Sequence, residues 1–143
     1  MNDKLSKYTF DEIEIGLTKQ FQITITESMV DNFAKLTGDF SPIHMDEDYA
    51  STTTFQKRVV HGMLLASFLS KIDGMYLPGK HALHISQSSN FINPCFIDEK
   101  ITVEGEVVDK SLATKIIKLK TTITNESGKT IIDGNAVVIV RDD

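Results

Sequence analysis

The sequence predicts an α+β fold with one domain, in which a curved antiparallel sheet wraps around a central apolar helix. A run that is apolar on nearly every side begins at Gly62, and a helix with this pattern is buried on most of its faces. Four segments of alternating apolar and polar residues follow it, a pattern typical of strands. With 143 residues, the chain is long enough to bury the core of a single domain.

The composition narrows the choice of partners. The net charge is -5, and no cluster of lysines or arginines is present, so a nucleic-acid partner is not expected. No apolar stretch is long enough to span a bilayer, and the N-terminus lacks the apolar run of a signal peptide. The single cysteine, Cys95, cannot form an internal disulfide, which suits a reducing cytoplasm. We therefore expect a cytoplasmic protein with small molecules or other proteins as partners, and no membrane partner.

The first third of the chain predicts a strand followed by a helix. Residues 1–8 are expected to form a loose lead. Residues 21–25 alternate apolar and polar side chains, so they are predicted to form a strand with one buried face. Thr26 then offers an N-cap oxygen, and apolar residues recur at helical spacing up to Gly38, which can end a helix in the left-handed conformation.

A loop and a short helix are expected before the central helix. Pro42 disfavours helix in the residue before it, so residues 39–44 are predicted to form an ordered loop. Asp46 is placed to cap a short helix that includes Tyr49. The central helix is predicted to begin at Gly62 and to run for about fifteen residues, which is too short to span a membrane.

Four strands are predicted after a turn at residues 77–79. They occupy residues 84–91, 101–108, 116–124 and 131–140. The edge strands of such a sheet can pair with a second copy of the chain, so we expect a homodimer.

The first candidate site is the pair Asp39 and His44, which lie five positions apart with Pro42 between them. A carboxylate and an imidazole are common general acids and bases, and the proline restricts the loop that carries them. The alternative is that Asp39 caps a turn and His44 is a packing or surface residue. Their spacing alone does not separate these two interpretations.

The second candidate site is the main-chain amide of Gly62, at the start of the apolar helix. Amides in the first turn of a helix lack internal partners, and glycine lets a ligand approach the backbone closely. A thioester carbonyl placed there would find a donor for the oxygen that becomes negative during reaction. The alternative is that Gly62 only allows close packing of the helix.

Other chemistries are less favoured. Asp39, His44, Asp46 and His61 lie close in sequence, but their spacing matches no common metal-binding motif, so we expect no metal and no cofactor. Cys95 lacks an indicated partner and is interpreted as a packing residue. Ser70 does not lie in a nucleophile elbow.

These residues occur in an order that resembles the MaoC-like (R)-specific enoyl-CoA hydratases, a branch of the hot-dog fold superfamily. The resemblance lies in residues 38–44 (GDFSPIH), residues 60–67 (VHGMLLAS) and the turn at residues 77–79 (LPG), and it extends over nearly the whole chain. It implies a single hot-dog domain over residues 1–143. The family usually has asparagine where this chain has Ser41, and the bracing of the loop is the feature that this difference affects.

The resemblance implies reversible addition of water to a trans-2-enoyl-CoA, giving the (R)-3-hydroxyacyl-CoA. Asp39 and His44 would hold a water; Asp39 would accept its proton, and His44 would donate a proton to C2. The amide of Gly62 would hold the thioester oxygen. Further substrate contacts are expected from Ser70, Met63, Leu65 and Tyr49.

Three alternatives remain open at this point. The same chemistry could act on an acyl-carrier-protein thioester, because both carriers present the same pantetheine arm. The chain could instead hydrolyse acyl-CoA thioesters, or it could bind them without turnover. The candidates for contact with the CoA phosphates are Lys57, Arg58 and Lys80.

Overall fold

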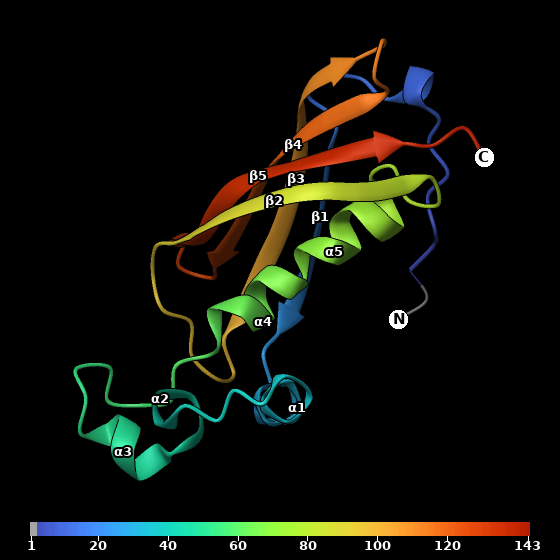
Figure 1. Cartoon of the computed structure of the whole chain (residues 1–143). Helices are drawn as coiled ribbons and strands as arrows, with labels where there is room; N and C mark the ends of the chain where they lie inside the picture. The colour runs from blue at the N-terminus through green and yellow to red at the C-terminus, as the bar shows by residue number, and fades with distance from the viewer. Residues whose placement is uncertain (1–2) are drawn as a thin grey trace.

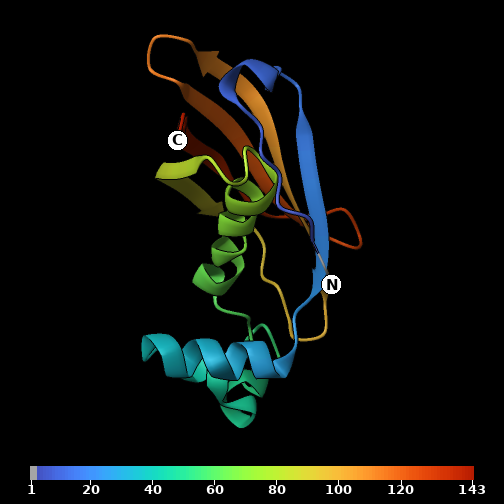
Figure 2. The same cartoon turned by 90° about the vertical axis from the view of Figure 1, so that its right-hand side faces the viewer.

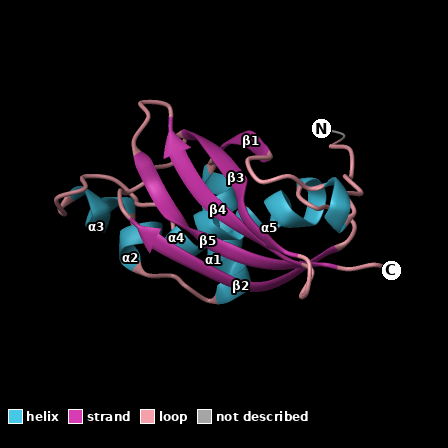
Figure 3. Ribbon diagram, turned by 90° about the horizontal axis from the view of Figure 1, so that it is seen from above, coloured by secondary structure: helices cyan, strands magenta, loops and turns pink. Residues whose placement is uncertain are grey.

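Five strands form one antiparallel sheet in a computed structural model that describes residues 3–143. The strands are β1 (Thr18–Thr24), β2 (Ala82–Phe91), β3 (Lys100–Ser111), β4 (Ile116–Asn125) and β5 (Thr130–Val140). Their order across the sheet is β1-β3-β4-β5-β2, so β1 and β2 form the two edges (Figures 1 and 3). All five predicted strands are therefore confirmed, with small differences in their bounds.

Within residues 3–143, seven helical segments accompany the sheet. They are η1 (Phe10–Glu12), α1 (Glu27–Thr37), α2 (Pro42–Met45), α3 (Glu47–Ser51), α4 (Gly62–Ser67), α5 (Leu69–Lys71) and η2 (Ile72–Tyr76). Among residues 3–143, none of these helices is both long and apolar enough to cross a bilayer.

The central helix consists of α4, α5 and η2, and it lies against one face of the curved sheet (Figure 2). The predicted helix of about fifteen residues from Gly62 is confirmed over residues 62–76, but it has an irregularity at Phe68 that the sequence analysis did not predict. There the hydroxyl of Ser67 donates to the carbonyl of Leu64 (2.6 Å), and the Phe68 amide donates to Leu65 only three residues back (3.1 Å). A serine that bonds to the preceding turn often bends a helix. The central helix then ends in the π-helical turn η2.

The core lies between this helix and the sheet. On β3, β4 and β5, buried residues alternate with more exposed ones, which confirms the predicted period of two. A Cβ on Gly105 of β3 would lie 2.6 Å from the side chain of Ile72, so this glycine lets the helix approach the sheet closely. The buried members of the three strands include Val103, Leu119 and Val138.

Residues 26–61 form a segment that we call the overhang, since it lies beyond the end of the sheet (Figure 1). Thr26 caps α1, and the side chain of Asp46 caps α3 by accepting from Tyr49, as predicted. The predicted loop over residues 39–44 is only partly correct, because Pro42 begins α2 and places His44 on a helix. Proline suits the first position of a helix, where its missing N–H would have no partner.

The N-terminal lead is ordered where it meets the turn after the central helix. Ser6 donates its amide to Met75 (2.8 Å), and Tyr8 donates to Pro78 (3.2 Å). Lys7 forms an isolated bridge with Gly79. The prediction of a loose lead is therefore wrong for residues 6–8, because the turn offers carbonyls that pair with it; residues 1 and 2 lie outside the described residues.

Candidate active site

Asp39 follows α1 directly, because Gly38 ends that helix in the left-handed conformation (φ 82°). The carboxylate of Asp39 accepts from the amide of Ser41 (3.1 Å), and the amide of Asp39 donates to the hydroxyl of Thr37 (3.2 Å). Asp39 therefore does cap a turn, as the alternative interpretation held, and this contact also orients its carboxylate. The loop is braced here through the main chain of Ser41, whose side chain makes no capping bond in the described structure.

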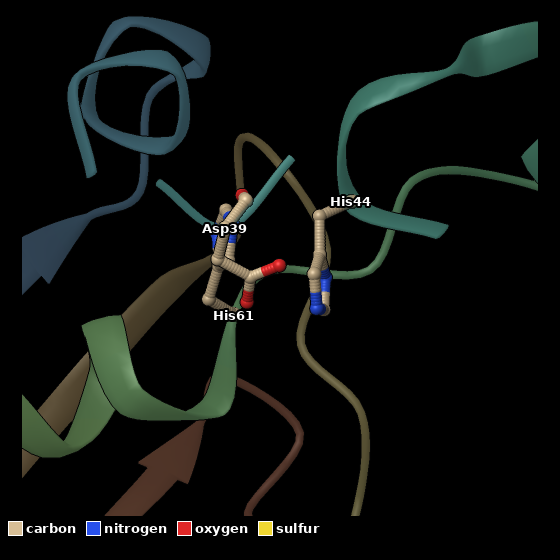
Figure 4. Close-up of side chains that lie close together, drawn as sticks. All are labelled: Asp39, His44 and His61. Atoms are coloured by element: carbon tan, nitrogen blue, oxygen red, sulfur yellow. The ribbon is translucent and has the colours of Figure 1, made fainter. Parts of the chain in front are cut away.

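His44 reaches the site from α2 and is partly buried. Its Nδ1 lies 2.6 Å from the carbonyl of Val59. Since a carbonyl can only accept, Nδ1 carries the hydrogen, and in the neutral ring Nε2 then holds a lone pair. Figure 4 shows the Asp39 carboxylate and the His44 ring beside one another. The overhang therefore presents a carboxylate together with a basic ring nitrogen.

His61 is the third member of this cluster, and it is 1% exposed. Its Nε2 lies 3.0 Å from the main-chain carbonyl of Asp39, and its ring stacks on His44 with centroids 4.1 Å apart. Burial lowers the pKa of His61, and charge on His44 lowers it further, while the carbonyl of Asp39 opposes the shift. The sequence singled out His61 only as a possible ligand; its one further signal was its position next to Gly62.

Asp39, His44 and His61 could each offer a ligand atom to a metal, and these atoms lie within 4.8 Å of one another. However, the two imidazole rings are stacked with an interplanar angle of 28°. Ring nitrogens bind metals through lone pairs in the ring plane, and two nearly parallel rings do not direct these toward one ion. The geometry suits a hydrogen-bonded water better than a metal.

Arg58 holds the overhang together from the inside. Its Nε donates to the main-chain carbonyl of His44 (2.6 Å), while its other nitrogens pair with Glu27 (3.0 Å) and Asp31 (2.9 Å) on α1. Arg58 is buried, so the candidate role at the CoA phosphates is wrong for this residue. It joins α1 to α2 and fixes the backbone of His44 instead. Lys57 and Lys80 are exposed and stay candidates.

A first cavity of about 600 Å³ opens beside this cluster. Its lining includes five of the predicted site residues: Asp39, His44, Gly62, Met63 and Leu65. The amide of Gly62 donates no hydrogen bond within residues 3–143, so it is a free donor at the start of α4. A Cβ on Gly62 would lie 2.7 Å from the ring of Phe91, so the glycine also allows close packing.

A second cavity of about 570 Å³ lies along the central helix and shares Asp39 and Met63 with the first. Ser70 lines this cavity together with Phe33 and other residues. Tyr49 is half exposed on α3 and, among the described residues, lines neither cavity. The structure therefore brings six of the seven predicted residues to two adjoining cavities and leaves Tyr49 outside.

Comparison with known proteins places the chain among its relatives. The MaoC like domain matches residues 11–129. This chain belongs to the MaoC-like family. It is similar to the (R)-specific enoyl-CoA hydratase of Rhodospirillum rubrum, with 38% identity over 96% of this chain and 95% of that protein. It is also similar to a 3-hydroxybutyryl-CoA dehydratase of Methylorubrum extorquens, with 36% identity over 92% of this chain and 83% of the other.

A solved structure supports the same placement of this MaoC-like chain. The (R)-hydratase from Aeromonas caviae, described as involved in PHA biosynthesis, superimposes with a TM-score of 0.87. The two sequences are 37% identical, and the match covers 90% of this chain and 97% of the other. The curved sheet around a central helix is thus the hot-dog fold, as the resemblance implied.

Cys95 also lines the first cavity of this MaoC-like chain but is buried. Burial raises the pKa of its thiol to about 12, and the nearby Glu99 adds to the shift. A thiol that stays protonated at neutral pH is a poor nucleophile. Cys95 therefore forms part of the wall of the cavity.

Proposed function

We propose that this chain catalyses the reversible, (R)-specific addition of water to a trans-2-enoyl-CoA. One observation carries the proposal: the Asp39 carboxylate and the His44 ring lie together on a cavity that also holds the free amide of Gly62. The names of the relatives, which are hydratases and a dehydratase of CoA thioesters, support the same reaction. The product would be the (R)-3-hydroxyacyl-CoA.

The thioester carbonyl would accept a hydrogen bond from the Gly62 amide. As water adds at C3, electrons move onto this oxygen and form an enolate, so a donor that is already aimed at the oxygen stabilises the transition state. Losing one such donor costs about 3 kcal/mol in comparable sites. No other group in the described structure competes for this amide.

The contact with Val59 changes the expected division of work between Asp39 and His44. Because Nδ1 donates to that carbonyl, a neutral His44 must receive a proton at Nε2 before it can give one. We therefore assign the first proton transfer to His44: the oxygen of water bonds to C3 while a proton passes from water to Nε2. Asp39 orients the water through its other hydrogen and stabilises the imidazolium.

The second proton transfer completes the addition. The imidazolium of His44 returns its proton to C2 of the enolate, which restores the neutral ring and the thioester carbonyl. Both new bonds form on the face of the substrate that meets Asp39 and His44, so hydrogen and hydroxyl add to the same face. The reverse sequence dehydrates the 3-hydroxyacyl thioester, since each step is a reversible proton transfer.

A second copy of the chain would cover the β2 edge of the sheet. Leu83, Ile85, Phe91 and Ile92 are each about half exposed along and beside this edge strand. The other edge, β1, exposes Thr18, Gln20 and Gln22 instead. Exposed apolar side chains next to a free strand edge are typical of an interface, so we propose a homodimer through β2.

The dimer is tested by the molar mass of the wild-type chain in solution and of the variant Ile85→Lys. We expect a dimer that the lysine weakens, and a wild-type monomer would overturn the proposed interface. The cytoplasmic location stays a prediction from the sequence.

The reaction is tested by the loss of enoyl-thioester absorbance with crotonyl-CoA. We expect (R)-3-hydroxybutyryl-CoA as product and no release of free thiol. Thiol release from a saturated acyl-CoA would instead identify a thioesterase, and tight binding without turnover would identify a binding module. Matched acyl-carrier-protein substrates would measure the preference for the carrier.

A further inference from the structure

His61 is a buried titratable residue that takes no part in the proton transfers described above. Its ring lies between two others: His44 stacks on it at 4.1 Å, and Phe33 is tilted against it at 4.8 Å. Its Nδ1 is buried without a hydrogen-bond partner in the described part of the chain. A leucine or phenylalanine would fill such a place without burying an unpaired nitrogen, so the presence of an imidazole calls for a reason.

His61 lies beside all three groups that the proposed reaction needs: its ring contacts Asp39 and His44, and its main chain directly precedes Gly62. The Nε2–H of His61 donates to the main-chain carbonyl of Asp39, and the ring face supports the ring of His44. Its own carbonyl accepts from Leu65 (3.2 Å), which fixes the main chain just before Gly62. Asp39 and His44 come from the overhang, whereas Gly62 belongs to the central helix. His61 therefore connects the two parts of the site.

We propose that His61 is a positioning residue that, as a neutral Nε2–H imidazole, sets Asp39 and His44 relative to each other and to the Gly62 amide. The proposal rests on the proposed function, since it concerns the alignment of the groups assigned to that reaction. A neutral ring serves both contacts. It can donate to a carbonyl through one nitrogen, and its face can support His44 without repelling the imidazolium that forms there.

The electrostatic surroundings of His61 agree with this geometry. Desolvation lowers the pKa of His61, and the charges of His44 and Arg58 act in the same direction. The carbonyl and the carboxylate of Asp39 act against it. Because the ring is almost fully buried, we expect desolvation to dominate and the ring of His61 to stay neutral at neutral pH.

Two substitutions separate the two contacts. His61→Gln keeps an N–H close to the place of Nε2 but removes the ring that supports His44. His61→Phe keeps a ring beside His44 but removes the donor to Asp39. Since small misplacements of catalytic groups can cost about a hundredfold, we expect kcat with crotonyl-CoA to fall about tenfold to a hundredfold in each, with KM changed less than threefold.

His81→Gln is the matched control, because His81 lines neither cavity and its ring forms one hydrogen bond among the described residues, an exposed one to the carbonyl of Asp143. It should keep wild-type kcat. Activities are compared per folded molecule, with the folded fraction taken from circular dichroism. If wild-type protein hydrates crotonyl-CoA but both His61 variants keep kcat within threefold, the positioning role is wrong. If wild-type protein has no hydratase activity, the proposed function itself fails.

A measurement on the unaltered protein tests the proposal even if both variants fail to fold. Nitrogen-15 NMR of the imidazole groups reports the tautomer and charge of each histidine. We expect His61 to remain a neutral Nε2–H ring while the pH is lowered from about 8 to about 6, a range that spans the ordinary histidine pKa. A protonated His61 at neutral pH, or hydrogen on Nδ1 instead, would overturn the assignment.

Discussion

The body of the protein and its overhang are held together by different forces. The body, made of the sheet and the central helix, is joined by apolar side chains such as Leu119 and Ile72, which are almost completely buried. The overhang has few such residues and is joined by polar contacts, among them Arg58 with the carbonyl of His44 and His61 with the carbonyl of Asp39. Apolar burial is not directional, whereas hydrogen bonds fix the orientation of the groups they join. We infer that the body supplies most of the stability and the overhang supplies the alignment of the catalytic groups.

The largest expected effect is on chemistry, from Asp39→Asn. Asparagine keeps an oxygen for the Ser41 amide but removes the negative charge that stabilises the imidazolium. General acid–base groups contribute about a hundredfold to ten-thousandfold, so kcat for crotonyl-CoA should fall about a thousandfold while the folding free energy changes little. Asp46→Asn, at a helix cap nearby, is the control and should keep its activity. An active Asp39→Asn variant would contradict the assignment.

In the body of the protein, the substitution Leu119→Ala is expected to affect stability instead of chemistry. Leu119 is fully buried on β4, so the substitution leaves a cavity and should lower the free energy of unfolding by about 2–5 kcal/mol. Urea titration followed by circular dichroism measures this loss. The kcat of the folded fraction should be unchanged, because Leu119 lines neither cavity. Leu112→Ala, at an exposed leucine, is the control for stability. A large loss of kcat in Leu119→Ala would contradict the inference that the body supplies stability and the overhang supplies the alignment of the catalytic groups.

Arg58→Met is expected to lower both kcat and stability to an intermediate extent. The substitution removes the hydrogen bond to the carbonyl of His44 but keeps the apolar part of the side chain. Glu27 and Asp31 keep access to solvent, so losing their partner costs little. The carbonyl of His44 loses its donor, which should cost about 1–3 kcal/mol of stability. We expect kcat to fall about tenfold, measured against the control Lys35→Met, at an exposed lysine of α1. Unchanged kcat would show that Val59 alone holds His44 in place.

The smallest effect concerns pH. The pKa of His61 is lowered in the folded state from its ordinary value of 6.5, so the unfolded chain takes up a proton first as the pH falls. The titration of His61 therefore leaves the free energy of unfolding unchanged above about pH 6.5 and lowers it progressively as the pH falls below that value. Asp73, whose pKa is raised by burial, acts in the opposite direction, so the comparison must be made between wild type and His61→Gln. Unfolding free energies measured from about pH 7 to pH 5 should fall less steeply in the variant. Equal slopes would contradict the neutral, buried ring.

Several features were predictable because they depend on neighbouring residues. The strands follow from alternation that places one face in the core, as Ile101, Val103 and Val107 do on β3. The caps at Thr26 and Asp46 follow from side chains that reach amides three residues ahead. Two features were missed: the irregularity at Phe68 and the start of α2 at Pro42. A serine hydroxyl in a helix can bond to the preceding turn or leave the helix regular, and a proline can stand just after a helix or at its first position, so the sequence does not decide either case.

Some residues of the candidate site were also predictable from the sequence, and others were not. The residue types and order between residues 38 and 67 were enough to single out Asp39, His44 and Gly62. The roles of Arg58 and His61 were not predictable, since Arg58 meets partners 14 to 31 residues away and His61 meets a carbonyl 22 residues away.

The sequence by itself determined the strands and the apolar helix, and it singled out the candidate acid Asp39 and the candidate imidazole His44, because periodicity, capping and side-chain chemistry act over short distances along the chain. Only the tertiary structure decided which nitrogen of His44 carries hydrogen, why Arg58 is buried, and that His61 joins the overhang to the helix. These features depend on carbonyls and rings that folding brings together from distant positions. No local pattern encodes their orientation.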